Sequence, residues 1–168
     1  MKIQKLSMML IGVLLLAGAV VSASAQTDLN TRKAVYFTGA KTNAIDLSKD
    51  VYASGGSTIH ISAELRTSCN NNVCEFNVGV IATKTGSGAA ATSVSLAAHG
   101  ETFTKSFTFG ASETSKQIIF PVKLKLGKNN IAVKIDPANQ ITETNENNNG
   151  FSTTVMVSWK QDNPDNKN

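Results

Sequence analysis

The stretch IIFPVKLKLGKNNIAVKI, residues 118–135, alternates between apolar and polar side chains in both of its halves. Every second residue is apolar from Ile118 to Leu126, and the same spacing returns from Ile131 to Ile135. Successive side chains of a β-strand point to opposite faces of a sheet, so this spacing predicts two strands that each bury one face. The Gly-Lys-Asn-Asn sequence between them predicts a turn.

The same alternation recurs along the chain, and no long stretch shows the 3.6-residue period of a helix. Further strands are predicted at 34–38, 58–66, 75–83, 102–109 and 151–159. The second and third of these are expected to form a hairpin. About seven strands at regular spacing predict an all-β fold. They favour a two-sheet antiparallel β-sandwich over a β-barrel, which the pattern alone leaves open.

Two residues mark strands that we expect at the edge of a sheet. Lys105 interrupts an apolar face that includes Phe103, Phe107 and Phe109. Pro121 lies within an alternating strand, and proline cannot donate a hydrogen bond to a neighbouring strand. A strand at the edge of a sheet accommodates either residue, and a bulge would also accommodate Pro121.

The first 25 residues predict a signal peptide that is removed on export. Lys2 and Lys5 make its beginning positive, and residues 8–21 are almost all apolar. Ala23 and Ala25 then supply the small side chains that a cleavage site requires. The apolar run is short for a membrane span, which needs about 20 residues.

Removal of residues 1–25 leaves one β domain, expected at 26–159, and a polar, disordered tail at 160–168. Because Lys2 and Lys5 leave with the signal peptide, the 16 basic residues fall to 14, against 12 acidic residues. This near balance gives no support to nucleic-acid binding. The protein is expected in the periplasm, on the cell surface or outside the cell, with no transmembrane segment after cleavage.

The two cysteines, Cys69 and Cys74, flank the turn sequence Asn-Asn-Asn-Val. In an oxidising compartment such a pair favours a disulfide that closes the loop. Half of a zinc site and a redox-active pair are the alternatives. The chain has no second cysteine pair to complete a zinc site, and the spacing is not that of a Cys-x-x-Cys motif.

Residues 127–150, GKNNIAVKIDPANQITETNENNNG, read as a strand, an acidic turn, a short strand and a second turn rich in Asn and Glu. This stretch resembles the end of the bacterial cell-adhesion-related domain family, CARDB. That family has Gly-x-Asn-x-Ile, a strand ending in Val/Ile-Asp, and then Asn-x-Ile/Val-x-Glu-x-Asn-Glu-x-Asn-Asn. The matching residues are Gly127, Asn129, Ile131, Ile135, Asp136, Asn139, Ile141, Glu143, Asn145, Glu146, Asn148 and Asn149.

The resemblance is strong over 127–157 and weaker, but consistent in strand order, from about residue 28. It departs from the family at the early hairpin, where the usual Asn-x-Gly is absent and the Cys69–Cys74 loop stands instead. The resemblance implies an immunoglobulin-like sandwich in an exported protein. More loosely, it implies adhesion or binding, because fold and function are separable.

The acidic, Asn-rich loop offers a candidate calcium site. Asp136, Glu143, Glu146 and Asn148 carry the oxygen ligands that calcium prefers, although their spacing is not that of an EF-hand. The alternative, which we favour, is turn chemistry, in which Asn, Asp and Glu side chains accept hydrogen bonds from nearby backbone amides.

A candidate basic patch comprises Lys123, Lys125 and Lys134, which the alternation places on outward faces of successive strands. Such a patch suits an anionic polysaccharide, a lipid headgroup or an acidic partner. The alternative, again favoured, is protection of an edge strand, because lysines there prevent edge-to-edge pairing of sheets.

Hydrolytic or transfer chemistry has no visible machinery in the sequence. Nucleophile-elbow, zinc-protease and phosphate-loop motifs are all missing, and His60 and His99 are expected to be solvated. The sequence therefore predicts a binding or adhesion module that is not an enzyme and has no cofactor, calcium excepted. Its partner is expected to be a protein or a cell-surface polysaccharide. The alternative is a structural subunit of a surface assembly.

Overall fold

The structure is a computed structural model that describes residues 26–38, 44–47 and 50–158. The expected signal peptide at 1–25, the expected tail at 160–168 and Trp159 at the end of the last predicted strand all lie outside the described residues.

Ten strands and one turn of 3-10 helix are present within the described residues. The strands are β1 (Asp28–Thr38), β2 (Val51–Ser54), β3 (Thr58–Ser62), β4 (Ser68–Asn70), β5 (Val73–Thr85), β6 (Ala90–Ala98), β7 (Glu101–Phe109), β8 (Ser115–Lys125), β9 (Gly127–Ile135) and β10 (Gly150–Ser158). The short helix, η1 (Ala63–Leu65), follows β3 directly.

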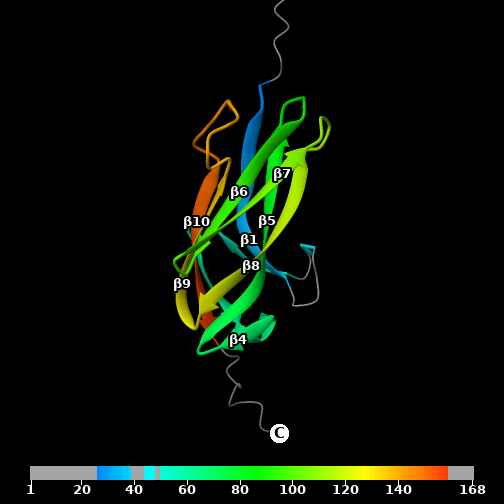
Figure 1. Cartoon of the computed structure of the whole chain (residues 1–168). Coiled ribbons are helices and arrows are strands. Elements are labelled where there is room, and N and C mark those ends of the chain that lie inside the picture. Colours follow the sequence, from blue (N-terminus) through cyan, green and yellow to red (C-terminus); the bar gives the residue numbers. More distant parts are fainter. Residues whose placement is uncertain (1–25, 39–43, 48–49, 159–168) are drawn as a thin grey trace, which may run out of the picture.

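The strands form two five-stranded sheets that pack face to face (Figure 1). Sheet A has the order β2–β1–β5–β4, with β8 paired to β5. Sheet B has the order β3–β10–β9–β6–β7, and its β3–β10 pair is parallel while all other pairs are antiparallel. The predicted all-β sandwich is confirmed, with more strands than the seven expected.

Three local predictions about strands are wrong. The strand expected at 58–66 ends at Ser62, and η1 begins at Ala63. It forms no hairpin with the next predicted strand, because β3 pairs with β10 in sheet B while β5 belongs to sheet A. The turn expected at 127–130 is the start of β9. Only Leu126 separates β8 from β9, and a positive φ of 94° at Gly127 lets the chain cross sharply between the sheets.

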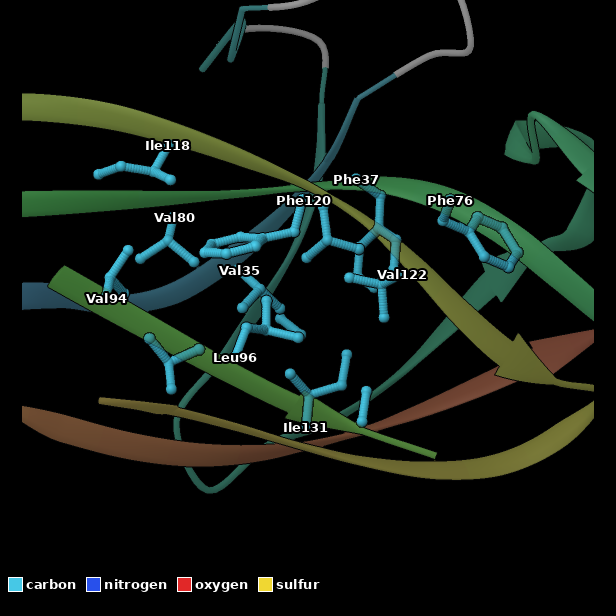
Figure 2. Packing of buried hydrophobic residues seen from close by; sticks show 14 of the residues in the cluster. Val35, Phe37, Phe76, Val80, Val94, Leu96, Ile118, Phe120, Val122 and Ile131 are labelled. Atoms are coloured by element: carbon cyan, nitrogen blue, oxygen red, sulfur yellow. The ribbon is translucent and has the colours of Figure 1, made fainter. Parts of the chain in front are cut away.

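The space between the sheets is filled by the apolar residues that the alternation pointed inward (Figure 2). Val35 and Phe37 of β1 and Phe120 of β8 face Leu96 and Ile131 of sheet B, and all five are buried. Each strand therefore turns an apolar face toward the core and a more polar face toward solvent, which is why its sequence alternates.

Ile81 breaks the alternation of β5, and the structure gives the reason. Its side chain points to the outer face of sheet A, where it is buried in a second cluster with Ala34, Tyr36 and Ile45. Ile45 belongs to the segment 44–47, and its backbone N–H donates to the Gln117 side chain at 3.0 Å. The chain thus covers part of the outer face of sheet A with its own residues.

The two expected edge positions are both observed. β7 ends sheet B, and β8 has β5 as its single neighbour in sheet A. The Lys105 ammonium donates to the Ile119 carbonyl at 2.6 Å and lies 5.5 Å from the centre of the Phe120 ring. This contact ties the edges of the two sheets together and places a charge where another strand would otherwise add.

Candidate functional site

Asp136 begins the acidic loop and is almost completely buried. One carboxylate oxygen accepts from the Ile141 backbone N–H at 2.8 Å, and the other accepts from the Thr92 hydroxyl at 3.2 Å. The Asp136 carbonyl also accepts from the Asn139 N–H at 3.0 Å, which closes a turn. The side chain therefore holds the loop against sheet B.

Glu143 fixes the other half of the loop to the beginning of the domain. Its carboxylate accepts from the Leu29 N–H of β1 at 2.5 Å and from the Asn149 side-chain amide at 2.9 Å. The Glu143 N–H donates to the Glu146 carboxylate at 3.1 Å. We call the contacts of the Glu143 carboxylate with Leu29 and Asn149 the Glu143 latch; the contact with Leu29 joins residues that are 114 positions apart.

The electrostatic surroundings of Glu143 are unfavourable to its charged form. Burial raises the pKa of the Glu143 carboxyl, and the carboxylates of Glu146 and Asp28 push it in the same direction. The hydrogen bonds from Leu29 and Asn149 act in the opposite sense, but the pKa remains above its ordinary value.

Asn148 completes the contacts between the loop and β1. Its amide nitrogen donates to both carboxylate oxygens of Asp28, at 3.0 and 3.2 Å. The side-chain oxygens of Asn148 and Asn149 are buried without a hydrogen-bond partner. Within 26–38, 44–47 and 50–158 there is no group of three or more His, Cys, Asp or Glu side chains that could hold a metal ion. Calcium binding stays a prediction, and the observed roles of the carboxylates are those of turn chemistry.

The three lysines of the expected basic patch lie on two different sheets. Lys123 and Lys125 are exposed on β8 of sheet A, whereas Lys134 is exposed on β9 of sheet B. Because β8 and β9 separate at Leu126, consecutive strands do not share an outer face, and the expected single patch is not formed. Lys123 instead approaches Glu101 of β7, with 3.7 Å between ammonium and carboxylate.

The predicted disulfide between Cys69 and Cys74 is confirmed. The two residues face each other in the β4–β5 hairpin, and the turn between these strands is formed by Asn71 and Asn72. Both have positive φ, 49° and 63°, which is the conformation of a two-residue type I′ turn. Cys74 is buried and Cys69 is exposed, so the bond pins the hairpin to the edge of the core.

A set of shallow hollows lies on the outer face of sheet B, which sequence reasoning did not single out. One hollow, of about 290 Å³, extends from the β6–β7 turn at His99 across Ala132 to Ser152. Another, of about 350 Å³, extends from Gly56 to Thr154 and also includes Ser152. Small side chains on this face leave the space open. The sequence signal that could have indicated them is the Ser, Thr and Ala content of the outward positions of β6, β7 and β10.

Comparison with known families identifies the fold. The profile of the CARDB family matches residues 44–153, which is well over half of the chain. The chain belongs to the CARDB family. The immunoglobulin-like sandwich expected from the motif at 127–150 is thereby confirmed. β1, at Asp28–Thr38, precedes the residues that the CARDB profile matches.

Two solved structures of the CARDB domain of the PF1109 protein from Pyrococcus furiosus are similar to this chain. A crystal structure of that domain in complex with di-metal ions shares 20% identity and a TM-score of 0.46, covering 79% of this chain and 90% of its own. A solution NMR structure shares 19% identity and a TM-score of 0.46, covering 81% and 99%. A comparison with curated proteins gave no match. No helix in the described part of the CARDB chain is long and apolar enough to cross a membrane.

Proposed function

We propose that this CARDB chain is an exported, non-catalytic binding module of the periplasm or the cell surface. The observation that carries the proposal is that its buried carboxylates have structural roles, whereas its open surface hollows are lined mostly by uncharged groups. The buried carboxylates of Asp136 and Glu143 are engaged in structural hydrogen bonds. The open hollows on sheet B are lined mostly by Ala, Ser, Thr and Asn residues, and their titratable side chains are those of His99 and Glu101. Such a surface suits recognition, whereas catalysis requires converging titratable groups.

The disulfide supports the export part of the proposal. Cys69 and Cys74 are joined in a hairpin, and disulfides persist in oxidising compartments outside the cytoplasm. The charged, apolar and small-residue segments of residues 1–25 supply the signal for export.

Two measurements test the proposal. Mass spectrometry of the protein from fractionated cells should find a chain that begins at Gln26 in the periplasmic, surface or culture fraction. The mature protein, fluorescently labelled, should bind saturably to envelope fragments of the producing cells and be displaced by unlabelled protein. A cytoplasmic chain that retains Met1, or binding that never saturates, would contradict the proposal.

A structural role in a surface assembly is the second candidate, because one observation favours it. Of the three exposed large apolar side chains of the described residues, Val51 and Tyr52 lie on β2, which ends sheet A, and Leu47 lies in the segment 44–47. Edge strands β7 and β8 carry lysine or proline, but β2 does not. An assembly through β2 would elute as an oligomer in size-exclusion chromatography and dissociate in the Val51→Lys variant. A monomer at all concentrations would exclude this route.

A further inference from the structure

The residues just before β1 are tied to the acidic loop. The Gln26 side-chain amide donates to the Glu143 carbonyl at 3.4 Å, and the Thr27 carbonyl accepts from the Thr144 N–H at 3.2 Å. The Leu29 contact of the Glu143 latch follows two residues later. Figure 1 shows the beginning of β1, in blue, beside this loop, in orange. The position at which the sequence predicts the mature chain to begin therefore lies against the acidic loop.

Three carboxylates gather at this place without a cation. They belong to Asp28 of β1 and to Glu143 and Glu146 of the loop. Burial raises the pKa of the Glu143 carboxyl most, and the charges of Glu146 and Asp28 add to the rise. Within 26–38, 44–47 and 50–158, no Lys or Arg side chain forms an ion pair with any of the three. The negative charge of this end of the domain is therefore not compensated by a side chain of the described residues.

Two acceptors at the same place lack a donor. The Asn149 side chain, 2% exposed, has its amide nitrogen 2.9 Å from the Glu143 carboxylate and 3.4 Å from that of Glu146. Its side-chain oxygen is buried without a hydrogen-bond partner, and so is that of Asn148, whose amide nitrogen donates to Asp28. Buried acceptors seldom stay unpaired, because an unmade hydrogen bond costs free energy. Unpaired acceptors beside uncompensated carboxylates indicate a missing group that is both positive and a donor, as an ammonium is.

We propose that this ammonium is the chain's own terminus, the α-amino group of Gln26 that signal-peptide removal creates. Hydrolysis of the Ala25–Gln26 peptide bond consumes one water, leaves the carboxylate on Ala25 and leaves the amine on Gln26. Before cleavage the Gln26 nitrogen is a neutral amide with one N–H; afterwards it is protonated at neutral pH and has three N–H donors. The contacts of Gln26 and Thr27 hold it beside the carboxylates. This inference rests on the proposed export.

The proposal makes the mature domain more stable than its precursor, so that removal of the signal peptide completes the fold. Burial is the largest cause of the raised pKa of Glu143, so the ammonium offsets only the part of the rise that Glu146 and Asp28 cause. A metal ion fits this place less well. It needs several ligands around one point, and no group of three His, Cys, Asp or Glu in the described part of the chain could hold one.

The test compares the mature chain with its Nα-acetylated form, which keeps every side chain but lacks the terminal charge. Both are made by ligating a synthetic peptide of residues 26–68 to a recombinant segment that begins at Cys69, followed by refolding and oxidation. Mass spectrometry checks that Gln26 has not cyclised with loss of ammonia, which would also remove the charge. An Asp28→Asn/Glu146→Gln variant removes two of the carboxylates. Glu101→Gln is the matched control, because Glu101 lies on β7 outside the acidic loop.

We expect acetylation to lower the melting temperature at pH 7 by about 2–5 °C. The carboxylates raise the pKa of the folded-state amine above its ordinary value of about 8, so its contribution is full below the unfolded-state pKa. It is lost as pH rises through the folded-state pKa, so acetylation should have little effect at about pH 10. The effect at pH 7 should fall by about half or more in Asp28→Asn/Glu146→Gln and be unchanged in Glu101→Gln.

Equal melting temperatures of the two forms at pH 7 would overturn the proposal. A loss that persists at pH 10, or that is as large in Asp28→Asn/Glu146→Gln, would overturn it too, because it would not come from the terminal charge and these carboxylates. If cells export a chain that begins at Gln26 and acetylation has no effect, the export proposal stands and only this inference fails. A cytoplasmic chain that retains Met1 would contradict both.

Discussion

The Glu143 carboxylate accepts a hydrogen bond from the Leu29 backbone N–H at 2.5 Å, and the two residues are 114 positions apart in the chain. Both are buried. This contact explains why an acidic residue stands in a loop that is otherwise rich in Asn: it satisfies a backbone donor at the beginning of β1 that water cannot reach.

Replacing Glu143 with alanine should destabilise the domain by about 2–3 kcal/mol, because the buried Leu29 N–H loses its acceptor. Thr142→Ala is the matched control, since Thr142 is an exposed residue of the same loop outside these contacts, and it should cost less than about 1 kcal/mol. Urea unfolding of the three proteins measures both values. Equal losses of unfolding free energy for the two variants would mean that the Glu143 contacts stabilise the domain no more than an exposed residue of the loop does.

The stability that Glu143 contributes should fall as pH rises. Its folded-state pKa is raised, so the folded chain binds its proton more tightly than the unfolded chain does. Its contribution is therefore full below the unfolded-state pKa and is lost as pH rises through the folded-state pKa. The unfolding free energy of the wild type minus that of Glu143→Gln should be smaller at about pH 7 than at about pH 4. A difference that stays constant or grows with pH would contradict this.

Gly79→Ala should be destabilising because of the segment that covers sheet A. A Cβ at position 79 would lie 2.5 Å from the Ile45 side chain, so the segment 44–47 would have to move. We expect a loss of about 1–3 kcal/mol, as for other overpacked sites. In a double-mutant cycle with Ile45→Ala, the loss should be smaller than the sum of the single losses, because alanine makes room. Additive losses would mean that Ile45 does not lie on Gly79 in solution.

Cys69→Ser should lower stability by about 2 kcal/mol at most, since the disulfide closes only a short loop. Binding to envelope fragments should be unchanged, because the hairpin belongs to sheet A, whereas the hollows lie on the outer face of sheet B. Thermal unfolding and the envelope assay measure the two effects. A folded variant that no longer binds would make the hairpin part of the binding site.

Millimolar calcium should leave the melting temperature of chelator-treated protein unchanged. The oxygens of Asp136 and Glu143 already accept hydrogen bonds from the backbone at Ile141 and Leu29. A cation that bound them in the folded state would raise the melting temperature by mass action. Such a rise in melting temperature would show that the acidic loop binds calcium, and Asp136→Asn should then abolish it.

Some of the candidate sites could be predicted from the sequence and others could not. The Cys69–Cys74 disulfide was predictable because its partners lie close together around a turn sequence. The Lys123, Lys125 and Lys134 patch was not, because its prediction assumed that strands consecutive in sequence lie side by side in one sheet. The hollows on the outer face of sheet B could not be predicted for the same reason, because their residues come from several strands whose order is set by pairing.

The sequence by itself determined that the chain folds into sheets, which residues face the core, and that the Asn-rich segments at 70–72 and 145–149 form turns. Each of these depends on near neighbours, through the two-residue period of a strand and the backbone preferences of Asn and Gly. The tertiary structure alone decided that β1 lies between β2 and β5, that β8 and β9 separate into different sheets, and that Glu143 meets Leu29. Alternation reports only which face of a strand is buried; the choice of neighbour depends on contacts between residues far apart in the chain.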